Sequence, residues 1–171
     1  MRVLGIDPGL TRCGFGVIDS TTTGKAALVA VGVLRSDPTA AIEQRLLDID
    51  TAISQLFVDY APDSIAVERV FAQANVRTVM GTAQVSGLAL VNASRRGLPV
   101  RSYTPSEVKA AITGSGRADK AQVGTMVTKI LGLPEMPKPA DAADALAIAI
   151  CHLWRGAAQD RLAAAVAAAR R

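Results

Sequence analysis

Four acidic residues stand where an acid is costly unless it has a function. Asp7 ends the apolar run RVLGID, and Glu68 interrupts a second one, IAVERVF. Asp141 and Asp144 are three residues apart at the start of ADAADALAIAI, so their side chains would project from one helix face about a turn apart. Carboxylates that are close together and shielded from water repel one another unless a cation compensates them. We therefore expect these four acids to hold metal ions.

The all-oxygen character of this set predicts both the metal and the reaction. Carboxylates suit hard cations such as Mg²⁺, for which Mn²⁺ can substitute, whereas zinc prefers histidine or cysteine. The single histidine, His152, is interpreted as a packing residue, and Cys13 and Cys151 lack the spacing of a zinc or redox site. Two metal ions about 4 Å apart would activate a water and stabilise the leaving oxygen of a phosphodiester. The acids thus predict a nuclease that leaves a 5′-phosphate and a 3′-hydroxyl.

Asp141 and Asp144 also have a simpler interpretation. Acids in the first turn of a helix favour its positive N-terminus without binding anything else. Asp7 and Glu68 weigh against this alternative, because the ends of strands are where α/β sheets commonly place ligand-binding groups. If the first and fourth strands are neighbours, Asp7 and Glu68 come together beside the last helix.

The spacing of apolar residues predicts the elements that would position these acids. Strands are expected at Arg2 to Asp7, Cys13 to Ser20, Ala26 to Leu34, Ser64 to Val70 and Leu98 to Tyr103. Helices are expected at Ala40 to Tyr60, Asn75 to Arg95, Lys120 to Leu131 and Ala140 to Trp154. Another helix should start with Thr104 as N-cap, Pro105 in its first turn and Glu107 completing a capping box. An antiparallel meander followed by alternating strands and helices predicts an α/β fold, with a mixed sheet covered on both faces.

The charges are unevenly divided along the chain. Its net charge is +4, yet the segment from Asp37 to Glu68 carries −6 and the segment from Arg95 to Pro134 carries +5. Lys109, Arg117 and Lys120 lie in the positive segment, which we expect to contact DNA. The alternative is that these charges only solvate a surface.

The length and composition predict one soluble domain. With 171 residues, half of them apolar, the chain can bury a full core without disulfides. We expect a nuclease domain over residues 1–156 and a C-terminal tail rich in alanine and arginine over residues 157–171. No apolar stretch is long enough for a membrane span and the start does not look like a signal peptide, so a cytoplasmic location is expected.

Four sequence segments carry a family resemblance. They are GIDPG at 5–9, AVERVF at 66–71, GSGRADKAQV at 114–123 and ADAADALAIAI at 140–150. Together, and in this order, they resemble the RuvC family of Holliday junction endonucleases. The resemblance implies a ribonuclease-H-like fold with a five-stranded sheet, a homodimer, Mg²⁺ dependence and paired symmetric nicks across four-way DNA junctions in recombination and repair. It also implies cooperation with a branch-migration motor complex.

The resemblance also assigns roles to the acids and lysines. Asp7, Glu68, Asp141 and Asp144 match the catalytic acids of the family. Some relatives carry histidine at the position of Asp141, so either metal binding or orientation of the attacking water is open for this residue. Lys109 and Lys120 match lysines near the scissile phosphate.

Two further matches concern the junction centre and the dimer. Phe71 matches an aromatic residue that is proposed to push against bases at the centre of the junction, as apolar wedges do elsewhere; packing in the core is the alternative. The helix at 75–95 resembles the dimer-interface helix, in which Gly81 and Gly87 would permit close approach. A twofold dimer would present two sites to a twofold substrate.

Two other functions are compatible with parts of the sequence. The segment GIDPGLTRCGFG resembles the phosphate-binding hairpin of actin-like ATP-binding proteins, although such proteins need two domains. A module that binds junctions without cutting them, or a related nuclease for structured RNA, would keep the same fold. Retention of all four acids argues against a module without catalytic activity.

Overall fold

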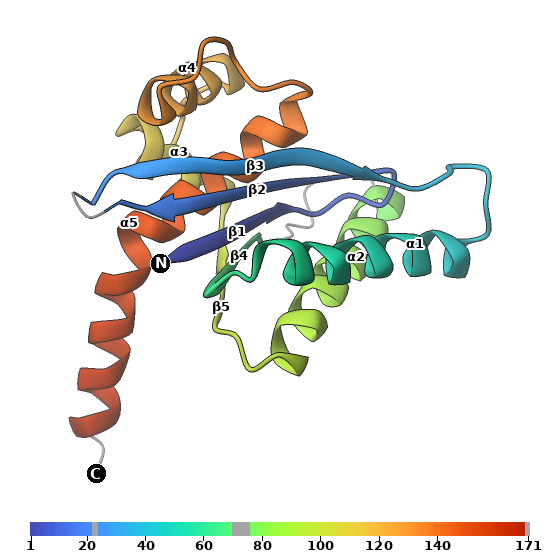
Figure 1. The fold of residues 1–171 in the computed structure, drawn as a ribbon, viewed down its shortest axis with the longest axis horizontal. Coiled ribbons are helices and arrows are strands. Elements are labelled where there is room, and N and C mark those ends of the chain that lie inside the picture. The colour runs from blue at the N-terminus through green and yellow to red at the C-terminus, as the bar shows by residue number, and fades with distance from the viewer. Residues whose placement is uncertain (22–23, 70–75, 170–171) are drawn as a thin grey trace.

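A five-stranded sheet forms the centre of the molecule, with strand order β3-β2-β1-β4-β5 (Figure 1). The strands are β1 (Arg2–Asp7), β2 (Arg12–Ser20), β3 (Ala26–Arg35), β4 (Ser64–Glu68) and β5 (Val100–Tyr103). β2 is antiparallel to both β1 and β3, whereas β4 runs parallel to both β1 and β5. The computed structural model describes residues 1–21, 24–69 and 76–169, without the side chains of 76–78 and 157–169. The predicted meander and mixed sheet are confirmed.

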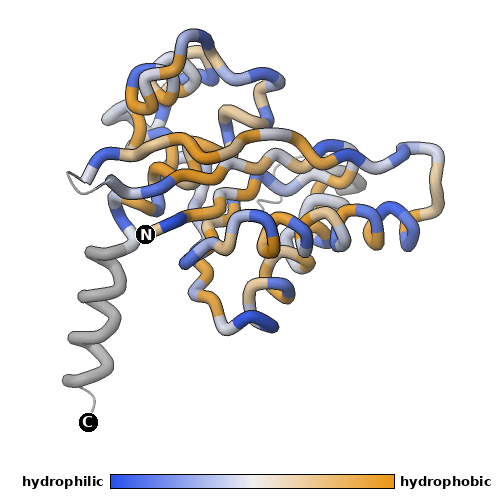
Figure 2. The backbone as a smooth tube through the Cα atoms, in the orientation of Figure 1, coloured by the Kyte–Doolittle hydropathy of each residue, from blue (hydrophilic) through white to orange (hydrophobic). Residues whose placement is uncertain are grey.

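Helices cover both faces of the sheet (Figure 1). They are α1 (Ile42–Tyr60), α2 (Val76–Arg95), α3 (Pro105–Thr113), α4 (Lys120–Leu131) and α5 (Ala140–Ala169). One core cluster joins the sheet to α1 and α2, and the other joins it to α3, α4 and α5. The strands are accordingly apolar along most of their length (Figure 2). Burial on both faces explains why β1 reads as an almost continuous apolar run.

The last helix is longer than predicted. We expected it to end near Trp154, but α5 continues to Ala169, and its C-terminal half extends away from the sheet (Figure 1). Alanine is the strongest helix former, and the single Gly156 costs only about 1 kcal/mol, which is too little to end the helix. The division between a domain at 1–156 and a tail at 157–171 stays a prediction.

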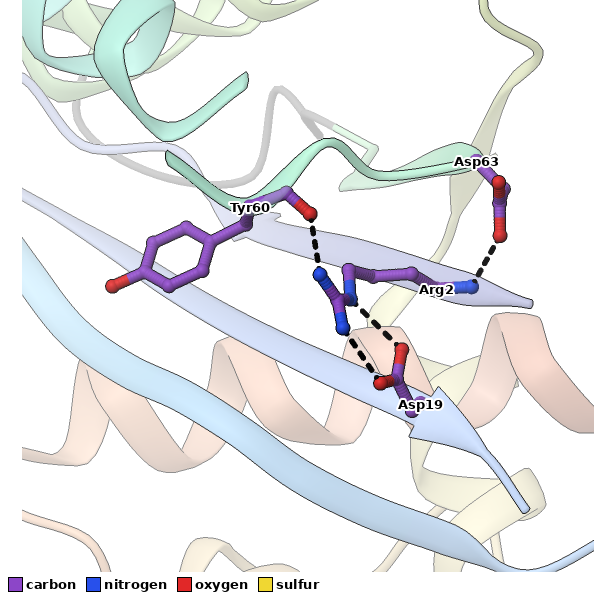
Figure 3. Close-up of polar contacts among 4 residues, drawn as sticks. All are labelled: Arg2, Asp19, Tyr60 and Asp63. Atoms are coloured by element: carbon purple, nitrogen blue, oxygen red, sulfur yellow. Dashed lines mark hydrogen bonds and ion pairs between the residues drawn. The ribbon is translucent and has the colours of Figure 1, made fainter. Parts of the chain in front are cut away.

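Arg2 binds three neighbouring segments at the start of β1, the end of the strand that is remote from Asp7 (Figure 3). Its guanidinium donates to both carboxylate oxygens of Asp19 at 2.9 and 2.8 Å, and to the carbonyl oxygen of Tyr60 at 2.8 Å. The backbone N–H of Arg2 donates to Asp63 at 2.6 Å. These bonds tie the start of β1 to the end of β2 and to the connection between α1 and β4. Since a slip of one residue would turn every side chain to the opposite face, this clamp helps to determine where Asp7 lies.

The predicted start of α3 is confirmed in detail. The Thr104 hydroxyl accepts a hydrogen bond from the backbone of Glu107, and the Glu107 carboxylate accepts one from the backbone of Thr104. Asp119 and Gln122 form a second capping box at the start of α4. Within the described residues, no helix has both the length and the apolar character needed to cross a membrane.

Candidate active site

Asp7 and Glu68 meet at the carboxyl ends of two parallel strands. Ile6 on β1 is paired with Val67 on β4, so the residues that follow them leave the sheet side by side. Both side chains border the same cavity, and the negative charge of Glu68 helps to raise the pKa of Asp7. The expectation that these acids come together if their strands are neighbours is thereby confirmed.

The surroundings of this pair make it hard to ionise both acids. Burial raises the pKa of Asp7 from 3.8 to about 8, and the negative charges of Glu68 and Asp144 act in the same direction. Burial also raises the pKa of Glu68, although the hydrogen bond from Asp7 partly opposes this rise. Without a cation, burial and the neighbouring negative charges therefore favour protonation within the pair. A nearby cation would remove the reason for this protonation.

Asp144 lies next to the pair, on the first turns of α5. Its carboxylate accepts a hydrogen bond from the Nζ of Lys120 on α4 at 2.9 Å. Together with Asp7 and Glu68 it lines a cavity of about 300 Å³, which Lys109 on α3 also borders. Three of the four predicted acids and both predicted lysines thus face one space, at the place where the sheet, α3, α4 and α5 meet.

Asp141 faces a different space. Its Oδ2 lies 3.0 Å from the Nε of Arg12, and both residues border a second cavity of about 740 Å³. Its charge still contributes to the raised pKa of Asp7, so it belongs to the same electrostatic cluster. Within the described part of the chain, no three acidic, histidine or cysteine side chains are grouped closely enough to hold a metal ion as they stand. Each acid of α5 has its own cation, Arg12 for Asp141 and Lys120 for Asp144.

Glycines allow α5 to approach the sheet closely enough to place its acids. A Cβ atom at Gly14 of β2 would overlap the backbone of Asp141, and one at Gly5 of β1 would overlap the carbonyl oxygen of Ala145. A Cβ at Gly16 would lie 2.7 Å from a methyl carbon of Leu146. The GFG segment in β2 therefore has a positioning role that the sequence did not indicate.

The remaining predicted DNA-binding residues are not all near the acids. Arg117 borders a separate hollow in the connection between α3 and α4, with Ser115 and Gln122. Phe71 lies outside the described residues, so its predicted role stays untested. His152 is 3% exposed, bonded to Tyr103 and Ser64, and Cys13 and Cys151 are free and buried. These three residues therefore have core surroundings, as expected.

The donor chemistry of the cluster fits a hard divalent cation. Every candidate ligand is a carboxylate oxygen, the donor type that Mg²⁺ and Mn²⁺ prefer. The raised pKa of Asp7 also reflects negative charge that lacks a sufficient positive counterpart. Asp7, Glu68 and Asp144 could bind such a cation from one cavity, and Asp141 could join after leaving Arg12.

Arg12 and Arg45 are the site residues that sequence reasoning missed. Arg12 lies at the start of β2, five residues after Asp7, and Arg45 lies on α1. The sequence already places Arg12 directly after the turn that follows Asp7, at the start of a predicted strand, and this position could have marked it as a site residue. Its pairing with Asp141, 129 residues later, depends on how α5 packs and leaves no signal in one sequence.

Comparison with known proteins identifies the family. The family model described as crossover junction endodeoxyribonuclease RuvC matches residues 3–152. A relative of that name from Thermobifida fusca is 65% identical, covering 96% of this chain and 91% of its own. Another from Salinispora arenicola is 60% identical over 100% of this chain and 98% of its own.

Solved structures agree with the sequence relatives. The RuvC structure of Thermus thermophilus has a TM-score of 0.86 and 36% identity, covering 93% of this chain and 97% of that one. RuvC of the same organism in complex with Holliday junction substrate has a TM-score of 0.83 and 38% identity, covering 89% and 92%. The yeast mitochondrial Holliday junction resolvase shares only the fold, with a TM-score of 0.62 and 15% identity over 88% and 78%. The chain therefore belongs to the crossover junction endodeoxyribonuclease RuvC family, with its ribonuclease-H-like fold.

Proposed function

We propose that this protein is a structure-selective endonuclease that resolves four-way DNA junctions by paired symmetric nicks in recombination and repair. Each cut hydrolyses a phosphodiester and leaves a 5′-phosphate and a 3′-hydroxyl. The observation that carries the proposal is the cavity shared by Asp7, Glu68, Asp144, Lys109 and Lys120, in a chain that belongs to this family. Acids for a metal and cations for a phosphate border the same space.

We propose that Asp7, Glu68, Asp141 and Asp144 are the catalytic acids and hold Mg²⁺, with Mn²⁺ as a substitute and two ions for each site. When bound, these ions would lower the pKa of a water and stabilise the leaving oxygen. Asp7, Glu68 and Asp144 border the same cavity, so the three carboxylates would face the same ions. The closeness of α5 to β1 and β2 keeps Asp144 next to Asp7 and Glu68 without further movement of the backbone.

The two lysines would hold the DNA backbone at the acids. Lys120 is 75% exposed whereas its partner Asp144 is 28% exposed, so the ammonium group approaches the cavity from the solvent side. Lys109 borders the same cavity from α3. Positive groups at these two places would bring a phosphate toward the acids, with little regard to base sequence. Arg117 would contact DNA from the connection between α3 and α4, and Phe71 would act at the junction centre.

The twofold symmetry of the substrate and the exposed apolar face of α2 both support a homodimer. On that helix Met80, Leu90 and Val91 are exposed, and a Cβ at Gly87 would meet nothing within 4 Å. These positions follow one another at helical spacing and would let two copies of α2 pack closely. The dimer would present two sites to two strands of the junction. Residues 1–156 would form the nuclease domain of each copy, and cooperation with a branch-migration motor complex is part of the same proposal.

The test is incubation with four-way, flap and linear DNA of the same sequence in Mg²⁺, with both cut positions mapped. The wild-type protein should cut the four-way junction at two symmetric positions and leave linear DNA intact. Asp7→Asn should bind the junction without cutting it, whereas Asp59→Asn, at the far end of α1, should cut at the wild-type rate. Cleavage by Asp7→Asn at the wild-type rate would remove Asp7 from the mechanism. Equal cutting of linear and four-way DNA would overturn junction selectivity.

A further inference from the structure

The larger cavity near the acids has no role in the function proposed so far. It has a volume of about 740 Å³ and lies between the turn at 9–12, the segment at 38–42 and the first half of α2. Asp141 borders it, whereas Asp144, one turn further along α5, borders the cavity that holds Asp7 and Glu68. Each of the two acids at the start of α5 therefore borders one of the two cavities.

Arg12 borders the larger cavity and is paired there with Asp141. Its Nε is paired with Asp141, and its side chain is 54% exposed while that of Asp141 is 22% exposed. An ion pair with so much contact to water holds the arginine only weakly. The guanidinium has further N–H donors, whose planar arrangement matches the oxygens of a phosphate.

A hydrogen-bonded brace holds the turn that carries Arg12. The Arg45 guanidinium donates to the Ser36 hydroxyl at 3.1 Å and to the Thr11 hydroxyl at 2.8 Å. Ser36, which is buried, donates in turn to the carbonyl oxygen of Leu10 at 2.5 Å. Arg45 is thus occupied in shaping the turn, and the brace limits where the backbone of Arg12 can lie.

The chemistry of the cavity suits a polyanion. Arg12 and Arg45 border it, and so do the polar side chains of Thr82 and Gln84 on α2. Asp141 is the only acid among its described lining residues, and Arg12 already neutralises it. A cavity of this size can take up a group as large as one nucleotide.

We propose that this cavity binds the nucleotide next to the scissile phosphate, with Arg12 contacting its phosphate. This inference rests on the proposed function and adds the path of the cleaved strand. A strand whose phosphate lies at Asp7, Glu68 and Asp144 has to continue in both directions. On one side it meets Lys109 and Lys120, and on the other side it enters the cavity bordered by Arg12.

The first experiment measures junction affinity against salt concentration, without divalent metal so that no cutting occurs. Each phosphate contact that is lost lowers the slope of log affinity against log salt by about one. Arg12→Ala should therefore show a slope about one lower than wild type. Arg35→Ala is the matched control, because Arg35 pairs with Arg12 across β2 and β3, is exposed and does not border the cavity.

Replacing single phosphates by neutral methylphosphonates locates the contact. In the wild type, one replacement beside the cut should weaken binding, and in Arg12→Ala the same replacement should have no further effect. The double variant Arg12→Ala/Asp141→Asn removes the acid that Arg12→Ala sets free. It should keep the lower slope if Arg12 itself contacts the phosphate.

Each other outcome overturns the inference. Recovery of the wild-type slope in the double variant would mean that Arg12 only neutralises Asp141. Wild-type salt dependence and an unchanged methylphosphonate profile in Arg12→Ala would exclude the contact altogether. If Arg12→Ala changes only the dissociation of the dimer, measured by sedimentation, the cavity is a contact between two copies of the protein and not a DNA site. If the wild-type protein fails to bind or cut junctions, the proposed function fails as well, and that result is recognised before any variant is compared.

Discussion

The variant Gly14→Ala should show whether the close approach of α5 to the sheet positions the acids for cleavage or serves folding alone. Gly14 is paired with Asp7 across β1 and β2, and it also contacts the start of α5. An added Cβ would overlap the carbonyl oxygen of Asp141 and lie 3.3 Å from its Cβ. A carbon and a carbonyl oxygen need about 3.3 Å, so the first turn of α5 has to move by about 1 Å. Such a displacement costs about 100-fold in rate, and the overpacking costs about 1–3 kcal/mol of stability.

Gly32→Ala is the matched control for this change. Its Cβ would lie 2.7 Å from the ring of Phe15, on the other side of β2 from β1 and away from the acids. Gly14→Ala should lose more stability in urea unfolding than Gly32→Ala, because the Phe15 ring can turn away from the new methyl group and the backbone of Asp141 cannot. Both variants should still bind a four-way junction as the wild type does. Only Gly14→Ala should lose cleavage, measured in a single turnover with excess protein in Mg²⁺. If both variants cut at the same rate, the close approach of α5 is needed for folding alone and the reasoning fails.

Two more predictions concern the charges of the site. Without metal, the pKa of Asp7 is about 8 in the folded protein and 3.8 in the unfolded chain. Between these two pH values the folded protein holds a proton that the unfolded chain has released. The contribution of this proton to the free energy of unfolding is therefore fully present below pH 3.8 and is lost as pH rises toward 8, by at most about 1.4 kcal/mol per pH unit. Urea unfolding in EDTA should show this fall for the wild type and not for Asp7→Asn, and parallel curves would contradict it. Lys120→Ala should weaken junction binding and lower its salt slope by about one, whereas Lys129→Ala, on the same helix but away from the acids, should not. An unchanged slope for Lys120→Ala would mean that this lysine only solvates the surface.

The sequence predicted most of the elements because each has a strong local signal. The capping box at Thr104 and Glu107 formed as predicted, since it depends on residues only three positions apart. The meander followed from three apolar runs separated by short turns, and β1 and β4 proved to be neighbours. The last helix extends beyond the predicted Trp154, because the alanines after Gly156 favour a helix and one glycine costs too little to end it. Elements and their order were thus accessible, and their exact ends less so.

The geometry of the site could be predicted only in part. The acids were recognisable because Asp7 and Glu68 break apolar strands, and because the family resemblance covered Asp141 and Asp144. The sequence did not reveal that Asp141 and Asp144 would face different cavities. That separation depends on how α5 packs against the sheet, and the partners of the two acids, Arg12 and Lys120, come from other elements that are distant in sequence. The sequence also did not reveal the role of the glycines, because Gly14 makes room for the start of α5 only once that helix lies against the sheet.

The two ion pairs of α5 have the same asymmetry, and it bears on how the site would work. In each pair the acid is the more buried partner, at 28% exposure for Asp144 and 22% for Asp141, while Lys120 and Arg12 are 75% and 54% exposed. The acids are held by the packing of α5 on the sheet, whereas the cations are held mainly by the acids. A divalent cation that took over the carboxylates would therefore release both positive side chains on the solvent side, next to the two cavities that DNA would occupy. Under the proposed function, metal binding and DNA binding would then favour each other, since each removes a competitor of the other.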